Sequence, residues 1–194
     1  TLMPHQIIIG DGSDPDIKYV CDEYLDLPIT YERCFPPSLA KQRNVGMACL
    51  KKDISLAGYL DDDIELDPDA TEKMLKFWAS APENTGGAAI SIRNQYAQAN
   101  RKLMSFFLMA GKQPGYMLRS AFAVHLPFIG KTFETKWLYG GATIWTRDVI
   151  EAFAYDEWFS GYGYLEDVDY SYRVGQKRRL YVVGDSCCLH HSAG

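Results

Sequence analysis

Three consecutive carboxylates, Asp61, Asp62 and Asp63, follow an apolar run at residues 54–60. Adjacent carboxylates repel one another unless a positive charge lies among them. A bound divalent metal ion would remove the repulsion, and a solvent-exposed turn would weaken it. A calcium loop of the EF-hand type has the same ligand spacing, but it needs glycine where Leu66 stands. The metal site and the solvated turn both stay open at this point.

Two more carboxylates, Glu166 and Asp167, stand where a helix is expected to begin. Acidic residues in a first helical turn complement the helix dipole, and Asp169 can pair with Arg173 on the helix surface. This structural interpretation does not explain the preceding segment WFSGYGY, which contains two glycines and four aromatic residues. Such a loop is typical of a binding surface, and a carboxylate beside it can accept a proton.

Asp11 lies in the segment GDGSDPD, directly after an apolar run. Glycines let a ligand approach the backbone, and a following helix offers free N–H groups, but a turn capped by Asp14 explains the same residues. His190 and His191 follow another apolar run near the end of the chain. Histidines are often structural, yet neutral imidazole is also a common ligand of divalent metals.

Apolar runs alternate with helix-like segments along the chain. Strands are expected at 5–9, 29–34, 54–60, 86–92 and 138–146, with one or two short strands near the C-terminus. Helices are expected from Asp14 to about Asp26, over 39–52 after Ser38, after Asp67 and Pro68, over 147–153, and from residue 166. Such alternation, at spacings too long for hairpins, predicts an α/β fold whose mostly parallel sheet has helices on both faces. Ligands bind at the carboxyl ends of strands in such sheets, where Asp11 and the run Asp61–Asp63 both fall.

The composition limits the class of protein. The chain has 194 residues, and 47% of them are hydrophobic, which suits one folded domain and argues against disorder. A net charge of −5 argues against a general nucleic-acid binder, so we expect no nucleic-acid partner. The five cysteines lack the spacing of a disulfide framework, which indicates reduced thiols and a cytoplasmic protein. No apolar run is long enough to cross a bilayer, and no signal peptide is recognised.

Several stretches carry a resemblance in a fixed order. They are IIIGDGSD, AKQRNVGMA, LAGYLDDDIELDPDA, LYGGATIWTRDVIEA, YDEWFSGYGYLEDVDYSYRV and LHHSAG. Together they resemble the nucleotide-sugar glycosyltransferases of family 2, which have the GT-A fold, and the expected source is bacterial. The resemblance implies a single GT-A-like domain over 1–194, with a nucleotide-binding half at 1–92 and an acceptor and catalytic half at 93–194. The family's first strand has no counterpart, so the chain is expected to start one strand late, and Gly10 replaces a usual acid.

The resemblance also implies roles for individual residues. Asp61 and Asp63 would form the Asp-x-Asp pair, in which Asp63 binds a metal that bridges the diphosphate. Asp167 would be the general base, and Glu166 would position the acceptor. The residues expected at the nucleotide sugar are Asp11, Arg43, Asn44, Asp61, Asp62, Gly140 and Gly141. The residues expected at the metal, Mn²⁺ or Mg²⁺, are Asp63, Asp61, His190 and His191.

The implied activity is metal-dependent, inverting transfer of a sugar from a nucleoside-diphosphate sugar, most simply a UDP-sugar, to a saccharide or lipid-linked acceptor. Cell-surface polysaccharide or glycolipid synthesis is the expected setting. Two alternatives stay open: a sugar nucleotidyltransferase, and a non-catalytic relative that binds nucleotide sugars. Segment 103–128 is apolar, broken by glycine and proline, and flanked by basic residues, so it either completes the core or contacts the inner face of the membrane peripherally.

Overall fold

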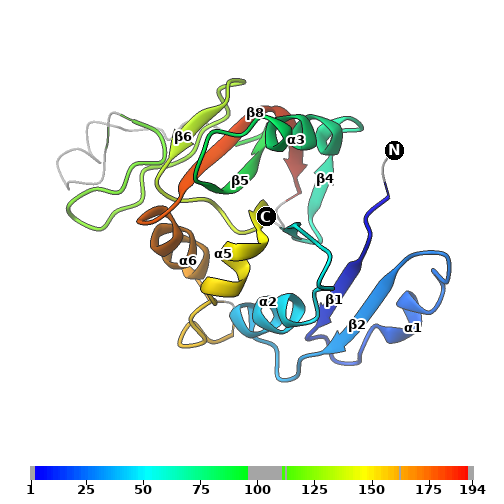
Figure 1. Cartoon of the computed structure of the whole chain (residues 1–194). Coiled ribbons are helices and arrows are strands. Elements are labelled where there is room, and N and C mark those ends of the chain that lie inside the picture. The colour runs from blue at the N-terminus through cyan, green and yellow to red at the C-terminus, as the bar shows by residue number, and fades with distance from the viewer. Residues whose placement is uncertain (1–2, 96–110, 112, 162, 192–194) are drawn as a thin grey trace.

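The computed structural model describes residues 3–95, 111, 113–161 and 163–191 (Figure 1). The larger sheet has the order β3-β7-β5-β8-β4, with β6 also paired to β8, and a smaller sheet consists of β1 and β2. The strands are β1 (Ile7–Asp11), β2 (Ile29–Arg33), β3 (Leu56–Leu60), β4 (Ile64–Leu66), β5 (Thr85–Ile92), β6 (Phe133–Thr135), β7 (Ala142–Thr146) and β8 (Arg179–His190). The helices are α1 (Lys18–Cys21), α2 (Leu39–Ala48), α3 (Ala70–Ala79), α5 (Arg147–Ala152) and α6 (Glu166–Gly175).

The predicted α/β class is confirmed, but the sheet is more mixed than strand–helix alternation alone predicts. β1 pairs with β2, and β5 with β8, in parallel. The other described pairs, β3–β7, β5–β7, β4–β8 and β6–β8, are antiparallel. β7 lies between β3 and β5 and runs in the reverse direction to both, which accounts for two of the antiparallel pairs.

Helices cover both faces of the larger sheet, as predicted. The ring of Phe77 on α3 lies 5.5 Å from the ring of Tyr181 on β8. Leu180 precedes Tyr181 on β8 and packs instead against α6, because a Cβ added to Gly175 of α6 would lie 3.2 Å from the Leu180 side chain. Because successive side chains of a strand point to opposite faces, α3 and α6 pack on opposite sides of β8 (Figure 1). The fully buried Trp145 also packs edge to face on Tyr170 of α6.

The helix expected from Asp14 to Asp26 is reduced to the single turn α1, Lys18–Cys21. The carboxylate of Asp11 accepts the backbone N–H groups of Ser13, at 2.7 Å, and Ile17, at 3.0 Å. These bonds hold residues 13–17 in a turn around Asp11, and the helix begins only after this turn, at Lys18.

Part of the segment expected at the membrane or in the core lies outside the described residues, including Phe106 and Phe107. Within the described part, Tyr116 and Phe128 are exposed. No helix of the described residues is long and apolar enough to cross a membrane. The five cysteines are all free thiols, in agreement with the sequence.

Candidate active site

Antiparallel pairing of β3 with β7 brings the acidic run beside the glycine pair. Leu60 lies opposite Ala142, so Asp61, just after β3, meets Gly141, just before β7. The Asp61 N–H donates to the Gly141 carbonyl at 2.9 Å. A Cβ on Gly141 would lie 2.6 Å from Asp61 Oδ2, and one on Gly140 would lie 2.6 Å from the guanidinium of Arg43. Side chains at 140 and 141 would therefore meet the functional groups of Arg43 and Asp61, and the expected contact of the two glycines with a donor sugar stays a prediction.

Pairing of β4 with β8 brings the two histidines to the other end of the acidic run. Ile64 lies opposite His190, and the His191 N–H donates to the Asp63 carbonyl at 2.8 Å. The His190 ring nitrogen Nε2 lies 2.9 Å from Asp63 Oδ2. The His191 ring instead lies 2.7 Å from Glu65 Oε2. Only His190 therefore contacts the second acid of the Asp-x-Asp pair through its side chain.

Arg43 on α2 is the cation shared by this site. Its buried guanidinium lies 2.8 Å from Glu166 Oε1 and 3.3 Å from Asp61 Oδ1. The guanidinium carbon also lies 5.1 Å from the ring centre of Tyr155 and 5.6 Å from that of Tyr59. Burial works against the charged form, but Tyr155 and the neighbouring carboxylates outweigh it and raise the pKa of Arg43. The guanidinium therefore stays charged and links α2, β3 and α6.

The two carboxylates at the start of α6 differ in their surroundings. Burial and the neighbouring Asp167 raise the pKa of Glu166, although its ion pair with Arg43 opposes this change. Burial also raises the pKa of Asp167, although hydrogen bonds from the backbone of Val168 and Gly140 oppose it. Asp167 Oδ2 accepts the Gly140 N–H at 2.9 Å. Glu166 is held in an ion pair with Arg43, whereas Asp167 has no ion pair at its side chain in the described structure, so Asp167 is the carboxylate available to accept a proton.

The acidic run Asp61–Asp63 has features that bear on metal binding. Among the described residues, no three His, Cys, Asp or Glu side chains form a complete metal site. Asp63 nevertheless has a buried oxygen, Oδ1, without a hydrogen-bond partner in the described part of the chain. Such an oxygen is costly unless a donor or a cation satisfies it. Mg²⁺ typically takes one or two protein carboxylates and completes its shell with substrate phosphates and water, so Asp63 with Asp61 fits an ion shared with a diphosphate.

Asp11 does not present a free carboxylate to a nucleoside. Besides Ser13 and Ile17, its Oδ2 accepts the Tyr31 hydroxyl at 2.6 Å and the Arg33 guanidinium at 3.1 Å. Burial alone would raise the pKa of Asp11, but the hydrogen bonds from Tyr31 and the backbone hold it well below its usual range. The structure therefore places Asp11 as the organising residue of the loop after β1.

Replacing Asp11 with alanine is expected to lower the free energy of unfolding by about 2–4 kcal/mol at pH 7, because buried donors lose a charged acceptor. Urea unfolding measures the loss, with Asp22→Ala as a control, because Asp22 pairs with Lys18 at an exposed site. The folded-state pKa of Asp11 is lowered, so its contribution is present above its unfolded pKa and is lost as the pH falls through the folded value. If Asp11→Ala and the wild type unfolded at the same urea concentration, Asp11 would not organise this loop.

Asp62 and Asn44, the other two residues expected at the nucleotide, have different surroundings. Asp62 is exposed. Asn44 is directed at the loop after α5, because its side-chain amide donates to the Tyr155 carbonyl and to Glu157 Oε1 and accepts the Tyr155 N–H at 2.8 Å. Sequence reasoning missed Tyr155, whose ring Asn44 thereby holds under Arg43. It also missed Asn94, which donates to the His190 carbonyl at 2.7 Å and accepts the His190 N–H. The sequence signal for Tyr155 was its place just before the aromatic segment WFSGYGY. No sequence signal pointed to Asn94.

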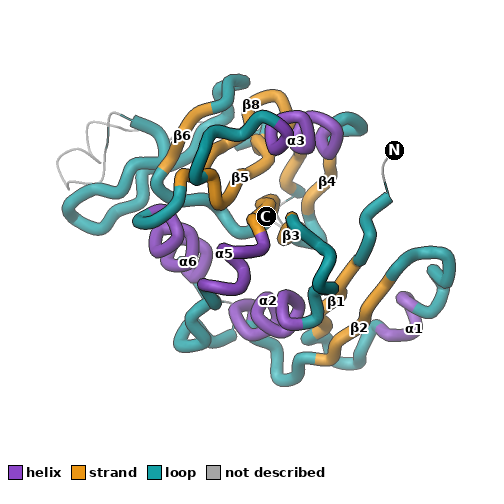
Figure 2. The backbone as a smooth tube through the Cα atoms, in the orientation of Figure 1, coloured by secondary structure: helices purple, strands orange, loops and turns teal. Residues whose placement is uncertain are grey.

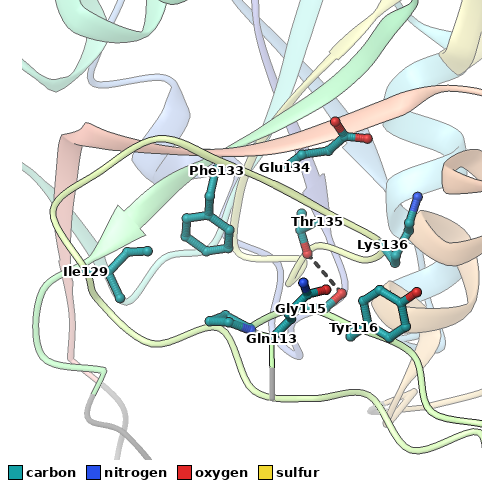
Figure 3. A pocket seen from close by; sticks show the side chains of 9 residues that line it. Gln113, Gly115, Tyr116, Ile129, Phe133, Glu134, Thr135 and Lys136 are labelled. Carbon is teal, nitrogen blue, oxygen red and sulfur yellow. Dashed lines mark hydrogen bonds between the residues drawn. The ribbon is translucent and has the colours of Figure 1, made fainter. Parts of the chain in front are cut away.

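A pocket of about 330 Å³ lies apart from these residues, beside β6 (Figure 3). Phe133, Ile129 and Tyr116 line it, and the Thr135 hydroxyl donates to the Gly115 carbonyl at its base. None of the predicted site residues lines this pocket.

Comparison with known proteins decides the family. The sequence pattern of glycosyl transferase family 2 matches residues 5–136 of the 194 residues. The chain belongs to this family. A search of curated proteins found no match. Family membership agrees with the resemblance drawn from the ordered motifs.

Several solved structures have a similar fold. A197 from STIV aligns with 97% of this chain and 85% of its own, with a TM-score of 0.56 and 15% identity. TarS 1–349 of S. aureus in complex with UDP aligns with 94% of this chain, with a TM-score of 0.61 and 12% identity. Its complex with UDP-GlcNAc gives a TM-score of 0.60 and 13% identity. The chain described here spans only 49% or 47% of those two TarS chains. The likenesses confirm the GT-A-type fold.

Proposed function

We propose that this family 2 glycosyltransferase moves a sugar from a nucleoside-diphosphate sugar to an acceptor hydroxyl, with inversion at the anomeric carbon. The observation that carries the proposal is the meeting of Asp61, Arg43, Glu166 and Asp167 from β3, α2 and α6 around the glycine pair. The UDP and UDP-GlcNAc complexes of TarS support a UDP-sugar as the donor. The acceptor is a saccharide or a lipid-linked acceptor, and the setting is cytoplasmic, at the inner face of the membrane.

In this reaction Asp167 accepts the proton of the acceptor hydroxyl while the oxygen of that hydroxyl bonds to the anomeric carbon. The bond from that carbon to the diphosphate oxygen breaks, and its electron pair leaves with the nucleoside diphosphate. The raised pKa of Asp167 makes it a stronger base than an ordinary aspartate. Arg43 fixes Glu166 and Asp61 relative to each other, and the absence of side chains at 140 and 141 leaves room for the donor sugar.

A divalent ion held by Asp63 and Asp61 would neutralise the charge that develops on the leaving diphosphate. His190 holds the other oxygen of Asp63 and so orients this carboxylate. This role of His190 differs from direct ligation and is the one the geometry favours.

Metal dependence gives a direct test of the proposal. A screen of nucleotide sugars by thermal shift and hydrolysis, with Mn²⁺ and with EDTA, is expected to identify one donor that is hydrolysed only with the metal. Asp63→Ala is expected to remove the metal dependence of UDP binding, measured by calorimetry. Glu65→Ala is the matched control, because Glu65 lies on β4 and the described hydrogen bond of its carboxylate is with the exposed His191 ring. Equal affinity for UDP with Mn²⁺ and with EDTA in the wild type would refute the role of Asp63.

A further inference from the structure

The loop between α5 and α6 exposes large aromatic side chains. Trp158 is 81% exposed and Tyr164 is 78% exposed. The other three tryptophans lie in the hydrophobic core or pack against it, and Trp145 is only 1% exposed. A tryptophan ring left in water costs hydrophobic free energy that folding would normally recover, so an exposed aromatic pair beside a catalytic base indicates a binding surface.

The described residues of this loop are held in place at several points. Its start is fixed by the paired hydrogen bonds of Asn44 with Tyr155. Its middle is fixed where the Gly161 carbonyl accepts the Leu39 N–H of α2 at 3.1 Å (Figure 2). The ring of Phe159 packs edge to face on Trp158 at 5.4 Å. The Trp158 ring is therefore presented on a fixed support, which lowers the entropy cost of binding a ligand.

The same loop leads directly into the base. Gly163 lies between the Phe159 backbone and the Glu166 side chain. A Cβ added to Gly163 would lie 3.2 Å from the Phe159 carbonyl oxygen and 3.7 Å from the Glu166 side chain. The Glu166 N–H donates to the Gly163 carbonyl at 3.0 Å. Leu165, with φ of 75°, turns the chain into α6 immediately before Glu166. The aromatic surface is thus connected by short contacts to the end of α6 that carries Asp167.

The charge of the loop selects among possible ligands. Residues 153–165, FAYDEWFSGYGYL, contain Asp156 and Glu157 and no lysine or arginine. Basic side chains contact the start of the loop, where the Arg173 guanidinium donates to the Ala154 carbonyl and Lys177 lies over the Phe153 ring. Asp156 and Glu157 directly precede Trp158, so an anionic lipid surface or a diphosphate headgroup would meet negative charge beside the Trp158 ring. The apolar C–H face of a sugar ring stacks on an aromatic ring, and its hydroxyls suit neighbouring carboxylates. A neutral saccharide therefore fits this surface best.

We infer that Trp158, with Tyr164, binds a sugar ring of the acceptor, so that the acceptor is a neutral saccharide at its reacting end. This inference rests on the proposed sugar transfer and adds the class of the acceptor to it. The stacked ring would place a hydroxyl of that sugar, or of the next one, toward Asp167.

The test uses 5-fluorotryptophan-labelled protein and ¹⁹F NMR, with the Trp158 signal assigned by its loss in Trp158→Phe. Neutral hexasaccharides of glucose, N-acetylglucosamine, mannose and galactose are titrated in turn. At least one is expected to shift the Trp158 signal saturably while the Trp145 signal stays. Failure of all four, or a shift caused by phosphatidylglycerol vesicles instead, would overturn the inference.

Kinetics with the saccharide found in this way provide the second readout. Trp158→Ala is expected to raise the acceptor KM about tenfold, as loss of one aromatic stacking contact predicts, and Trp158→Phe to recover part of it. Tyr19→Ala is the control, because Tyr19 is an exposed aromatic residue on α1. An unchanged KM in Trp158→Ala counts against the inference. Failure of the proposed function would appear as absent hydrolysis of the donor by the wild type. Failure of this inference would appear in the ¹⁹F titration with saccharides, which needs no donor, so the two failures are distinguishable.

Discussion

Replacing Asp167 with asparagine is expected to lower the rate of sugar transfer by about two to four powers of ten, the usual contribution of a positioned base. Asparagine keeps the shape of the side chain, and its single carbonyl oxygen can still accept one of the two backbone N–H groups, of Gly140 or of Val168, that the carboxylate accepts. It cannot accept the proton of the acceptor hydroxyl. Donor binding, measured by calorimetry with the nucleotide sugar, is therefore expected to remain while turnover is lost.

Stability and pH dependence distinguish this loss from unfolding. Burial raises the pKa of Asp167, so the ionised carboxylate opposes folding at neutral pH, whereas asparagine loses the acceptor for one backbone N–H. Because the two effects oppose each other, Asp167→Asn is expected to melt close to the wild type. Since the pKa of Asp167 is raised, kcat/KM of the wild type should fall with decreasing pH at a value above the ordinary aspartate pKa of about 3.9. Asp169→Asn is the control on the same helical turn, because Asp169 pairs with Arg173. Near wild-type turnover in Asp167→Asn would leave this residue only a structural role.

Replacing Arg43 with methionine is expected to lower the free energy of unfolding by about 3–5 kcal/mol, because a buried ion pair then loses one partner. Methionine keeps much of the length of the side chain and removes its charge. The carboxylate of Glu166 is left buried without a cation, and Asp61 loses its contact to α2. Thermal and urea unfolding at pH 7 measure the loss, and transfer activity should fall with it.

Two further measurements assign this cost to the unpaired carboxylate. The double variant Arg43→Met with Glu166→Gln is expected to recover part of the stability, since it removes the uncompensated charge. The pKa of Glu166 is already raised, and without Arg43 it should rise further, so the folded state binds a proton more readily than the unfolded state. The stability of Arg43→Met should therefore increase as the pH falls below neutral. Arg179→Met is the control, because the pair of Arg179 with Glu134 is exposed. A wild-type melting temperature for Arg43→Met would contradict the shared-cation role.

Sequence patterns determined the elements and the chemical groups of this protein. Apolar runs identified β3, β5 and β7 within a few residues, whereas the one or two short strands expected near the C-terminus form the single 12-residue strand β8. The Glu-Asp pair after an aromatic loop marked the start of α6. These features are local, because the periodicity of side chains and the residues at element ends reflect backbone geometry over a few positions.

Only the tertiary structure decided which groups meet. Arg43 and Glu166 are 123 residues apart in the chain, and their ion pair depends on how α2 packs against the start of α6. His190 rather than His191 reaches Asp63 because the register of β4 on β8 places Ile64 opposite His190, and successive side chains of a strand point to opposite faces. Asn44 turned to Tyr155, and Asp11 to Tyr31, because each finds its hydrogen-bond partners there. Strand register and helix packing arise from contacts between distant segments, which no local pattern encodes.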